Sequence, residues 1–237
     1  MTYVMGFVAA VPVANKKAYQ AFAEESVGYF KGLGVTRMLE SWGDDVSRGK
    51  VTDFYRAVAA KPDEEIVYSF QFYPDAAAAA AANEKMANDP AMAEMGAKMP
   101  FDGARMIYGG FDVVAERHGK GETGYLEGSI IAVPNSARQS YIDYANKLSA
   151  LFLAHGAVRS VDAWGDEVPD GKVTDFKKAV AAKNDETVVL GWIEWPSKQV
   201  RDGAWPKMME DPLLQNDGVG IDESRRVFGG FVPILDR

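Results

Sequence analysis

The chain has 237 residues, of which 47% are hydrophobic and 25% are charged, a composition typical of a folded globular protein. Its 26 basic and 34 acidic residues give a net charge of −8, so its electrostatic field repels nucleic acid and anionic membranes, and we expect neither as a partner. It contains no cysteine, which excludes disulfides, thiolate metal sites and a cysteine nucleophile.

The two histidines, His118 and His155, are too few for a three-histidine metal site within one chain, and we predict no metal. His155 falls near the end of an expected helix. Haem ligation is one interpretation of such a residue, but a histidine favoured by the negative end of the helix dipole is the simpler one. We therefore predict no cofactor.

No stretch approaches the roughly 18 consecutive apolar residues that a membrane-spanning helix needs. Residues 7–14 are apolar, but Lys16 and Lys17 follow them, whereas the basic residues of a signal peptide precede its apolar stretch. These features predict a cytoplasmic protein.

The chain repeats itself: residues 3–74 align with residues 125–196 and share many identities. The strongest match pairs residues 42–54 with residues 164–176. The intervening segment is polar and rich in glycine, as a linker would be. We predict a tandem duplication with a first repeat at 1–117, a linker at 118–124 and a second repeat at 125–237.

Each repeat predicts the order strand, helix, strand, long loop, strand, helix, strand. The expected strands of the first repeat are 3–11, 35–42, 66–73 and 106–114, and those of the second are 125–133, 157–164, 188–195 and 226–234. The first helix follows Pro12 or Pro134, and the second follows Pro74 or Pro196. Seven consecutive alanines at 76–82 favour a packed helix because alanine has the highest helix propensity.

Two βαββαβ units in tandem predict an α+β protein made of two ferredoxin-like repeats. In such a unit both helices lie on one side of a four-stranded sheet, so the other side needs a cover. The simplest cover is the second unit. We predict that the two sheets pair face to face as an intramolecular α/β barrel.

Three segments of the chain are distinctive. They are the WGDDV and GKVTDF motifs at 42–46 and 49–54 with their copies, residues 100–111 (PFDGARMIYGGF), and the pair formed by Lys85-Met86 and Asp89-Pro90. These segments resemble the YbaA-like family of bacterial proteins, a family of unknown function. The resemblance covers nearly the whole chain, once per repeat. It implies the dimeric α/β-barrel superfamily and no assigned chemistry.

Strand alternation suggests which side chains face the shared interior. Glu40 and Asp162 stand at equivalent positions, each two residues before a tryptophan, and we predict them as catalytic acids or bases. A carboxylate among aromatic rings acquires a raised pKa, as a general base requires. The predicted ligand-binding residues are Tyr3, Trp42, Tyr125, Glu127, Trp164, Trp192, Glu194 and Arg226, with Arg226 as an anion clamp. The alternative is a set of ordinary salt bridges near strand ends.

The repeated loop at 43–54 also contains polar residues, among them Asp44, Lys50, Thr52 and Asp53. Oxygen ligands suit a hard cation, but the spacing matches no known metal loop, and turn-forming residues account for most of the pattern.

Three classes of function stay open on these grounds. The first is a cofactor-independent enzyme, such as a small monooxygenase or isomerase, that uses Glu40 or Asp162 as a base. The second is a module that binds a small apolar molecule without changing it. The third is a structural or interaction protein with a filled barrel. We expect the chain to be either a monomer, in which the two repeats form an intramolecular pseudo-dimer, or a protein that associates further with copies of itself.

Overall fold

The computed structural model describes residues 2–215 and 217–237. Within these residues, eight strands form one closed barrel in the order β1-β3-β2-β8-β5-β7-β6-β4, and neighbouring strands are antiparallel. The first repeat supplies β1 Tyr3–Pro12, β2 Arg37–Asp45, β3 Glu64–Tyr73 and β4 Ile107–His118, and the second supplies β5 Tyr125–Pro134, β6 Arg159–Glu167, β7 Glu186–Trp195 and β8 Val227–Asp236. This architecture confirms the predicted fold class.

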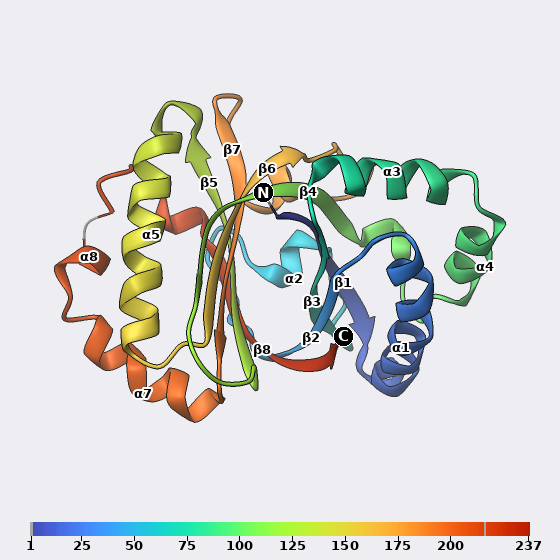
Figure 1. Cartoon of the computed structure of the whole chain (residues 1–237), viewed down its shortest axis with the longest axis horizontal. Helices are drawn as coiled ribbons and strands as arrows, with labels where there is room; N and C mark the ends of the chain where they lie inside the picture. The colour runs from blue at the N-terminus through green and yellow to red at the C-terminus, as the bar shows by residue number, and fades with distance from the viewer. Residues whose placement is uncertain (1, 216) are drawn as a thin grey trace.

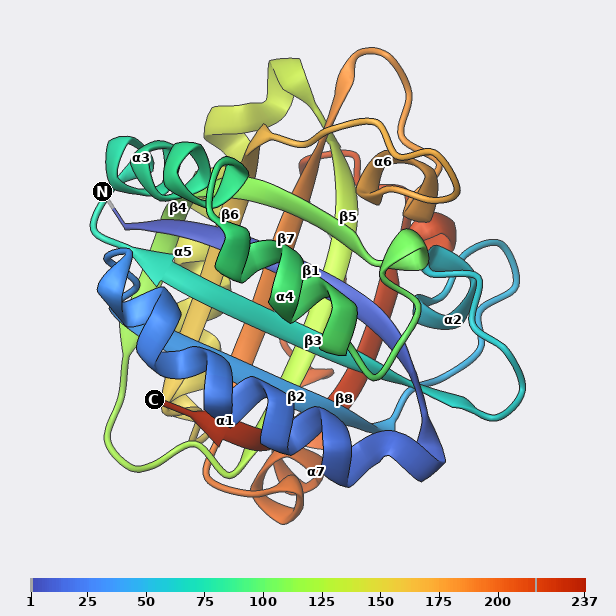
Figure 2. The same ribbon diagram turned by 90° about the vertical axis from the view of Figure 1, so that its right-hand side faces the viewer.

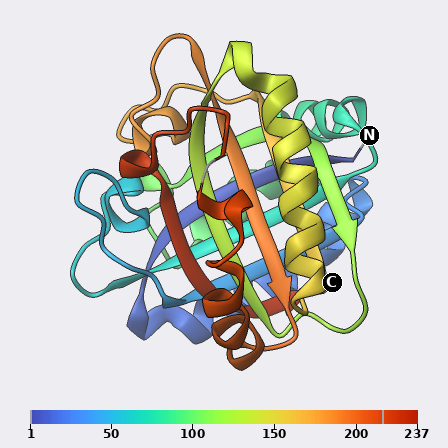
Figure 3. The same cartoon turned by 90° about the vertical axis from the view of Figure 1, so that its left-hand side faces the viewer.

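Helices cover the barrel on two opposite sides (Figure 1). On the side seen in Figure 2 lie α1 Lys16–Gly32, α3 Ala76–Ala87 and α4 Pro90–Lys98 of the first repeat. On the side seen in Figure 3 lie α5 Arg138–Ala154, α7 Lys198–Met208 and α8 Pro212–Gln215 of the second repeat. Two short helices, α2 Phe54–Ala57 and α6 Phe176–Ala179, follow the repeated loops. Each strand therefore has one face toward the interior and one toward the helices.

Strand pairing joins the two repeats along two seams, β2 with β8 and β4 with β6. The repeated loops reinforce the seams, because Thr52 donates to the carbonyl of Arg225 at 3.0 Å and Thr174 donates to the carbonyl of Arg105 at 3.4 Å. Asp53 caps α2 by accepting from the backbone N–H of Arg56 at 2.7 Å. These loop residues thus have structural partners, and the described residues contain no group of three or more acids or histidines arranged to hold a metal ion.

The barrel interior is a close-packed aromatic core. Phe70 and Trp192 come from opposite repeats and stack with ring centroids 4.1 Å apart. Phe54 of α2 and Phe231 of β8 meet edge to face with centroids 5.1 Å apart, so α2 contributes to the same core. Burying rings from both repeats against one another stabilises the closed barrel.

The predicted faces of several strands are wrong. The interior is formed by Val4, Leu39, Leu126 and Val161, which alternate along their strands with the residues that were predicted to face it. Both faces of these strands are buried, so both carry apolar side chains, and alternation alone cannot tell which face is which. The predicted site residues that consequently lie outside the interior are Tyr3, Glu40, Trp42, Tyr125, Glu127, Asp162, Trp164 and Arg226. Trp192 and Glu194 face the interior as expected.

Strand β4 ends at His118 and β5 begins at Tyr125, and the repeat boundaries given above stay a prediction. Of the helices in the described residues, none combines the length and the apolar character that crossing a membrane requires.

Replacing Trp192 by alanine tests whether the interior is core. Its side chain is 2% exposed, so we expect the substitution to lower the free energy of unfolding by about 3–5 kcal/mol, measured by urea denaturation. Val51→Ala is the control, because Val51 is 53% exposed and should change stability by less than about 0.5 kcal/mol. An equally small loss for Trp192→Ala would show that the interior is loosely packed.

Candidate functional site

A buried carboxyl group and a tyrosine form a pair between the sheet and the first helix of each repeat. In the first repeat, Tyr19 of α1 donates to Glu40 of β2 at 2.7 Å. In the second repeat, Tyr141 of α5 donates to Asp162 of β6 at 2.5 Å. The acids predicted from the sequence therefore do recur at equivalent places, but beneath the helices. The tyrosine partners were not predicted, because the acids were assigned to the opposite face.

The surroundings of the two acids move their pKa values toward neutrality. Burial raises the pKa of Glu40 to about 7, although hydrogen bonds from Tyr19 and Ser69 oppose this rise. Burial likewise raises the pKa of Asp162 to about 6, against the hydrogen bond from Tyr141 and the positive charge of Arg226. Each acid can gain or lose a proton near physiological pH, which a general base requires.

The two pairs differ in access to solvent. Glu40 is only 7% exposed, and Phe101 packs on Tyr19 with ring centroids 5.7 Å apart. Asp162 is partly exposed. Ile221 takes the place of Phe101 in the second repeat and packs in the cluster that contains Tyr141. The first acid is sealed, whereas the second can be reached from solvent.

The sheet beside Asp162 carries small side chains. Pairing across β6, β7, β5 and β8 places Asp162, Gly191, Ser129 and Phe228 in one row on the helix-facing side. A β-carbon at Gly191 would lie 2.9 Å from Ser129 Oγ and 3.2 Å from Asp162 Oδ1. A side chain at position 191 would therefore crowd both Ser129 and Asp162, and glycine leaves space between these two polar groups.

The matching row of the first repeat is filled. There Glu40, Ser69, Phe7 and Tyr108 stand opposite one another, so a serine replaces the glycine and a phenylalanine replaces Ser129. Comparison of the two rows shows that the second repeat combines a partly exposed acid with smaller neighbours, Gly191 and Ser129. We refer to the row Asp162, Gly191, Ser129 and Phe228 as the acid trough.

Trp42 and Trp164 lie beside the acids under basic side chains. Lys16 lies 5.0 Å from the ring centroid of Trp42, and Arg138 lies 5.5 Å from that of Trp164. The ring of Trp164 is 6.1 Å from that of Tyr141, which places this tryptophan next to the second acid and tyrosine pair. Of the two, only Trp164 adjoins the accessible acid.

Tyr3 and Tyr125 bridge the repeats. Tyr3 Oη donates to Asp166 at 3.2 Å, and Tyr125 Oη donates to Asp44 at 3.0 Å. Burial raises the pKa of both tyrosines above the usual range, so they remain protonated donors. Their contacts explain the aspartates of the repeated loop and assign both tyrosines to barrel closure.

Glu127 lies under α7. Trp205 Nε1 donates to both of its carboxyl oxygens at 2.9 Å, and Arg201 forms an ion pair with it at 3.5 Å. Met5 and Asn83 stand at the places of Glu127 and Trp205 in the first repeat, where they line an open hollow of about 430 Å³. Trp205 and Arg201 occupy the corresponding space in the second repeat.

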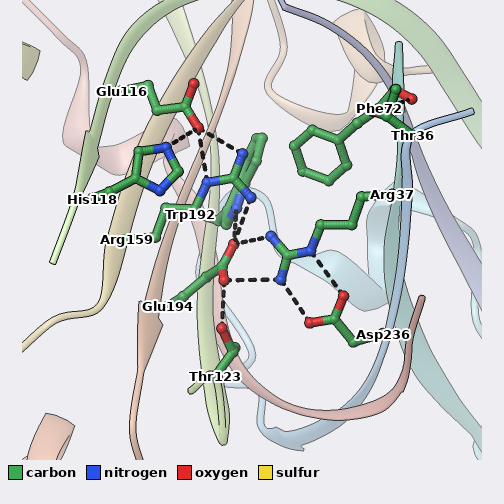
Figure 4. Close-up of polar contacts among 10 residues, drawn as sticks. All are labelled: Thr36, Arg37, Phe72, Glu116, His118, Thr123, Arg159, Trp192, Glu194 and Asp236. Atoms are coloured by element: carbon green, nitrogen blue, oxygen red, sulfur yellow. Dashed lines mark hydrogen bonds and ion pairs between the residues drawn. The ribbon is translucent and has the colours of Figure 1, made fainter. Parts of the chain in front are cut away.

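Glu194 lies at one end of the barrel and is surrounded by donors (Figure 4). Both guanidinium Nη atoms of Arg37 donate to it, at 2.8 and 3.0 Å, and Arg159 donates at 3.3 Å. Thr123 donates at 2.5 Å and Trp192 at 3.2 Å. Burial alone would raise the pKa of Glu194, but these hydrogen bonds and charges hold it below its usual value.

This ion network follows the internal symmetry of the chain. Arg37 and Arg159 are equivalent residues, and each also pairs with a carboxylate of the neighbouring strand across a seam, Asp236 at 2.7 Å and Glu116 at 2.6 Å. Both guanidinium groups also lie over the ring of Phe72, at 5.5 and 4.7 Å from its centroid. Every oxygen of Glu194 is engaged, so this end of the barrel is a closure. Neither arginine was predicted, although their recurrence in the two repeats was a usable signal.

His155 is the C-cap residue of α5, and its Nδ1 lies 3.0 Å from the carbonyl oxygen of Leu151. This position at the helix terminus is the one that the simpler interpretation of the sequence described.

Comparison with known proteins gives the following matches. The family described as "Protein of unknown function (DUF1428)" matches residues 2–103 and again residues 124–223. "Uncharacterized protein YbaA" of Escherichia coli strain K12 is 50% identical over 116 residues, which are 49% of this chain and 99% of that protein. The protein of the same name from Shigella flexneri has the same identity and coverage.

Among solved structures, a "Putative monooxygenase" of Fusobacterium nucleatum matches with a TM-score of 0.63 and 11% identity, covering 100% of this chain and 94% of that one. A protein of the same description from Lactobacillus acidophilus gives a TM-score of 0.58 and 12% identity, covering 100% and 96%. An "anthrone oxidase-like protein" gives a TM-score of 0.53 and 12% identity, covering 100% and 92%. At these identities the similarity shows a shared fold.

The pH dependence of stability tests the burial of Glu40. The folded state holds its pKa at about 7, whereas the ordinary value is 4.5, so folding favours the protonated form. The resulting stabilisation is complete below about pH 4.5 and is lost as the pH rises through about 7. In urea denaturation at a series of pH values, Glu40→Gln should remove this loss, on the order of 2–3 kcal/mol relative to the parent protein.

Glu84→Gln, at an exposed position of α3, is the control and should follow the parent curve. If Glu40→Gln kept the parent dependence between pH 4.5 and 7, Glu40 would not be the group that titrates there.

Proposed function

Since the chain belongs to DUF1428, a family of proteins of unknown function, we propose its function from the geometry of the site. The protein binds a small aromatic carbonyl compound at the acid trough, and Asp162 removes a proton from a carbon atom of that compound. The observation that carries this proposal is the partly exposed Asp162, held by Tyr141 at 2.5 Å, beside a row of small side chains. One structural neighbour is described as an anthrone oxidase-like protein, and anthrone is an aromatic ketone with an acidic CH₂ group.

The proton transfer uses groups that are already in place. Above a pH of about 6 the carboxylate of Asp162 is ionised and can accept the proton of an acidic C–H bond. The electron pair of that bond moves toward the carbonyl oxygen of the substrate, which becomes an enolate. The cation of Arg226, which already lowers the pKa of Asp162, stabilises this negative charge. Return of the proton to carbon regenerates the starting compound, so the step is balanced without any cofactor.

Tyr141 positions the carboxylate. Its hydroxyl donates to Oδ1, and its own pKa is raised well above the ordinary value, first by burial and then by the charge of Asp162, so it stays protonated throughout. Oδ2 accepts no hydrogen bond from any residue that the structure describes, which leaves this oxygen for the substrate proton.

Deuterium exchange tests the proposal. The probe is 2-indanone, an aromatic ketone whose CH₂ protons are acidified by both the ring and the carbonyl group, incubated with the protein in D₂O under nitrogen and followed by ¹H NMR. The parent protein should accelerate loss of the CH₂ signal, with a rate that rises through a pH of about 6 to a plateau. Asp162→Asn should reduce this acceleration by roughly 100-fold or more.

Asp143→Asn, at an exposed position of α5, is the matched control for a lost carboxylate and should exchange 2-indanone like the parent. Glu40→Gln is the comparison between repeats: loss of exchange in this variant but not in Asp162→Asn would move the chemistry to the first repeat. No acceleration by the parent protein would contradict proton removal and favour a filled barrel with a structural role.

A further inference from the structure

We infer that the acid trough accepts molecules with a carboxylate, which Arg226 holds together with Arg48 and Lys50 of the first repeat. This inference deepens the proposed function and rests on it for the location of the site. It names the substrate class as small aromatic carbonyl compounds that also carry a carboxylate.

A hollow of about 180 Å³ adjoins the end of the trough. One wall is formed by Arg226, which directly precedes β8, and by Phe228, which is the first residue of β8 on its helix-facing side. The other wall is the segment 47–53, which follows β2 of the first repeat. Phe228 is 53% exposed and belongs to both the hollow and the row that ends at Asp162. The site is therefore built from both repeats, and its size suits one small ring with a charged substituent.

Two of the three cations that line the hollow, Arg48 and Lys50, have no ion-pair partner among the described residues. Arg48 lies over the ring of Tyr55 at 4.2 Å. The one acid that lines the hollow, Asp53, is occupied by the backbone N–H groups of α2 and the preceding loop and by Arg56 at 3.2 Å. These cations stand out in a chain whose net charge is −8.

Arg226 retains a donor for a ligand. Its Nε and Nη2 donate to Glu223, both at 2.6 Å. Nη1 donates to no acceptor among the described residues. The pair with Glu223 fixes the guanidinium plane, and a carboxylate placed at the Nη1 side would receive a charge-assisted hydrogen bond.

The equivalent region at the other seam lacks this arrangement. There Met106 of the first repeat stands at the position of Arg226, and Asp170 of the second repeat stands at the position of Arg48 and pairs with Lys177 at 3.0 Å. The hollow therefore has two cations that its equivalent lacks, and it is the hollow that adjoins the accessible acid. A carboxylate at Arg226 would orient the rest of an aromatic molecule along Phe228 toward Ser129 and Asp162.

Binding of benzoate, with its uncharged analogue benzamide, tests the inference by NMR titration of the intact protein. Benzoate should bind at least tenfold more tightly than benzamide, and the difference should shrink as salt is added. Arg226→Met and Arg48→Asp introduce at each position the residue found at its equivalent in the other repeat, Met106 and Asp170, so the fold should accommodate them. Each should weaken benzoate binding by roughly tenfold and leave benzamide binding unchanged.

Arg117→Met removes an exposed arginine elsewhere and should bind benzoate like the parent. Equal affinity for benzoate and benzamide, no benzoate binding, or unaltered binding by Arg226→Met would overturn the inference. The binding measurement needs no turnover. Charge-dependent benzoate binding without exchange of 2-indanone would retain the carboxylate site and reject proton removal. Exchange of 2-indanone without charge-dependent benzoate binding would retain proton removal and reject the carboxylate site.

Discussion

Closure of a single barrel by two halves of one chain is the constraint on which the rest of the structure depends. A βαββαβ sheet covered by helices on one side leaves its second face open to water, and here the partner repeat buries that face. The seams β2 with β8 and β4 with β6 satisfy the strand edges. The stacking of Phe70 on Trp192 across the interior then gives both repeats a common core.

Because one chain forms the whole barrel, its two repeats can carry different residues at equivalent positions. Arg37 and Arg159 lie near each other at one end, where both pair with Glu194 and each also pairs with a second carboxylate, Asp236 or Glu116. Phe72, the counterpart of Glu194, provides an apolar surface for both guanidinium groups. One chain can hold different residues at two equivalent positions, which a symmetric dimer of one repeat cannot. The same freedom separates a sealed acid, Glu40, from an accessible one, Asp162.

The asymmetry gives the second repeat its chemical character. Gly191 leaves room where the first repeat has a serine, and Arg226 supplies a cation where the first has a methionine. Burial then keeps the pKa of Asp162 close to neutrality, and the hydrogen bond from Tyr141 fixes one of its oxygens. The loop of the first repeat lines the hollow beside Phe228 from the other side of a seam, so the carboxylate site that we propose needs both halves of the chain.

The duplication, the order of the strands and helices, and the barrel could be predicted from the residues alone, because each depends on local periodicity and on repetition along the chain. Glu40, Asp162 and Arg226 were also recognisable as unusual, the acids because they recur. Which face of each strand meets the helices was not predictable in this way, since both faces are buried and apolar and the choice depends on how the two repeats pack together. In the structure the acids lie against the tyrosines of α1 and α5, and Glu194 lies in the ion network that closes one end of the barrel. These contacts join residues that are distant in the chain, so local sequence patterns could not predict them.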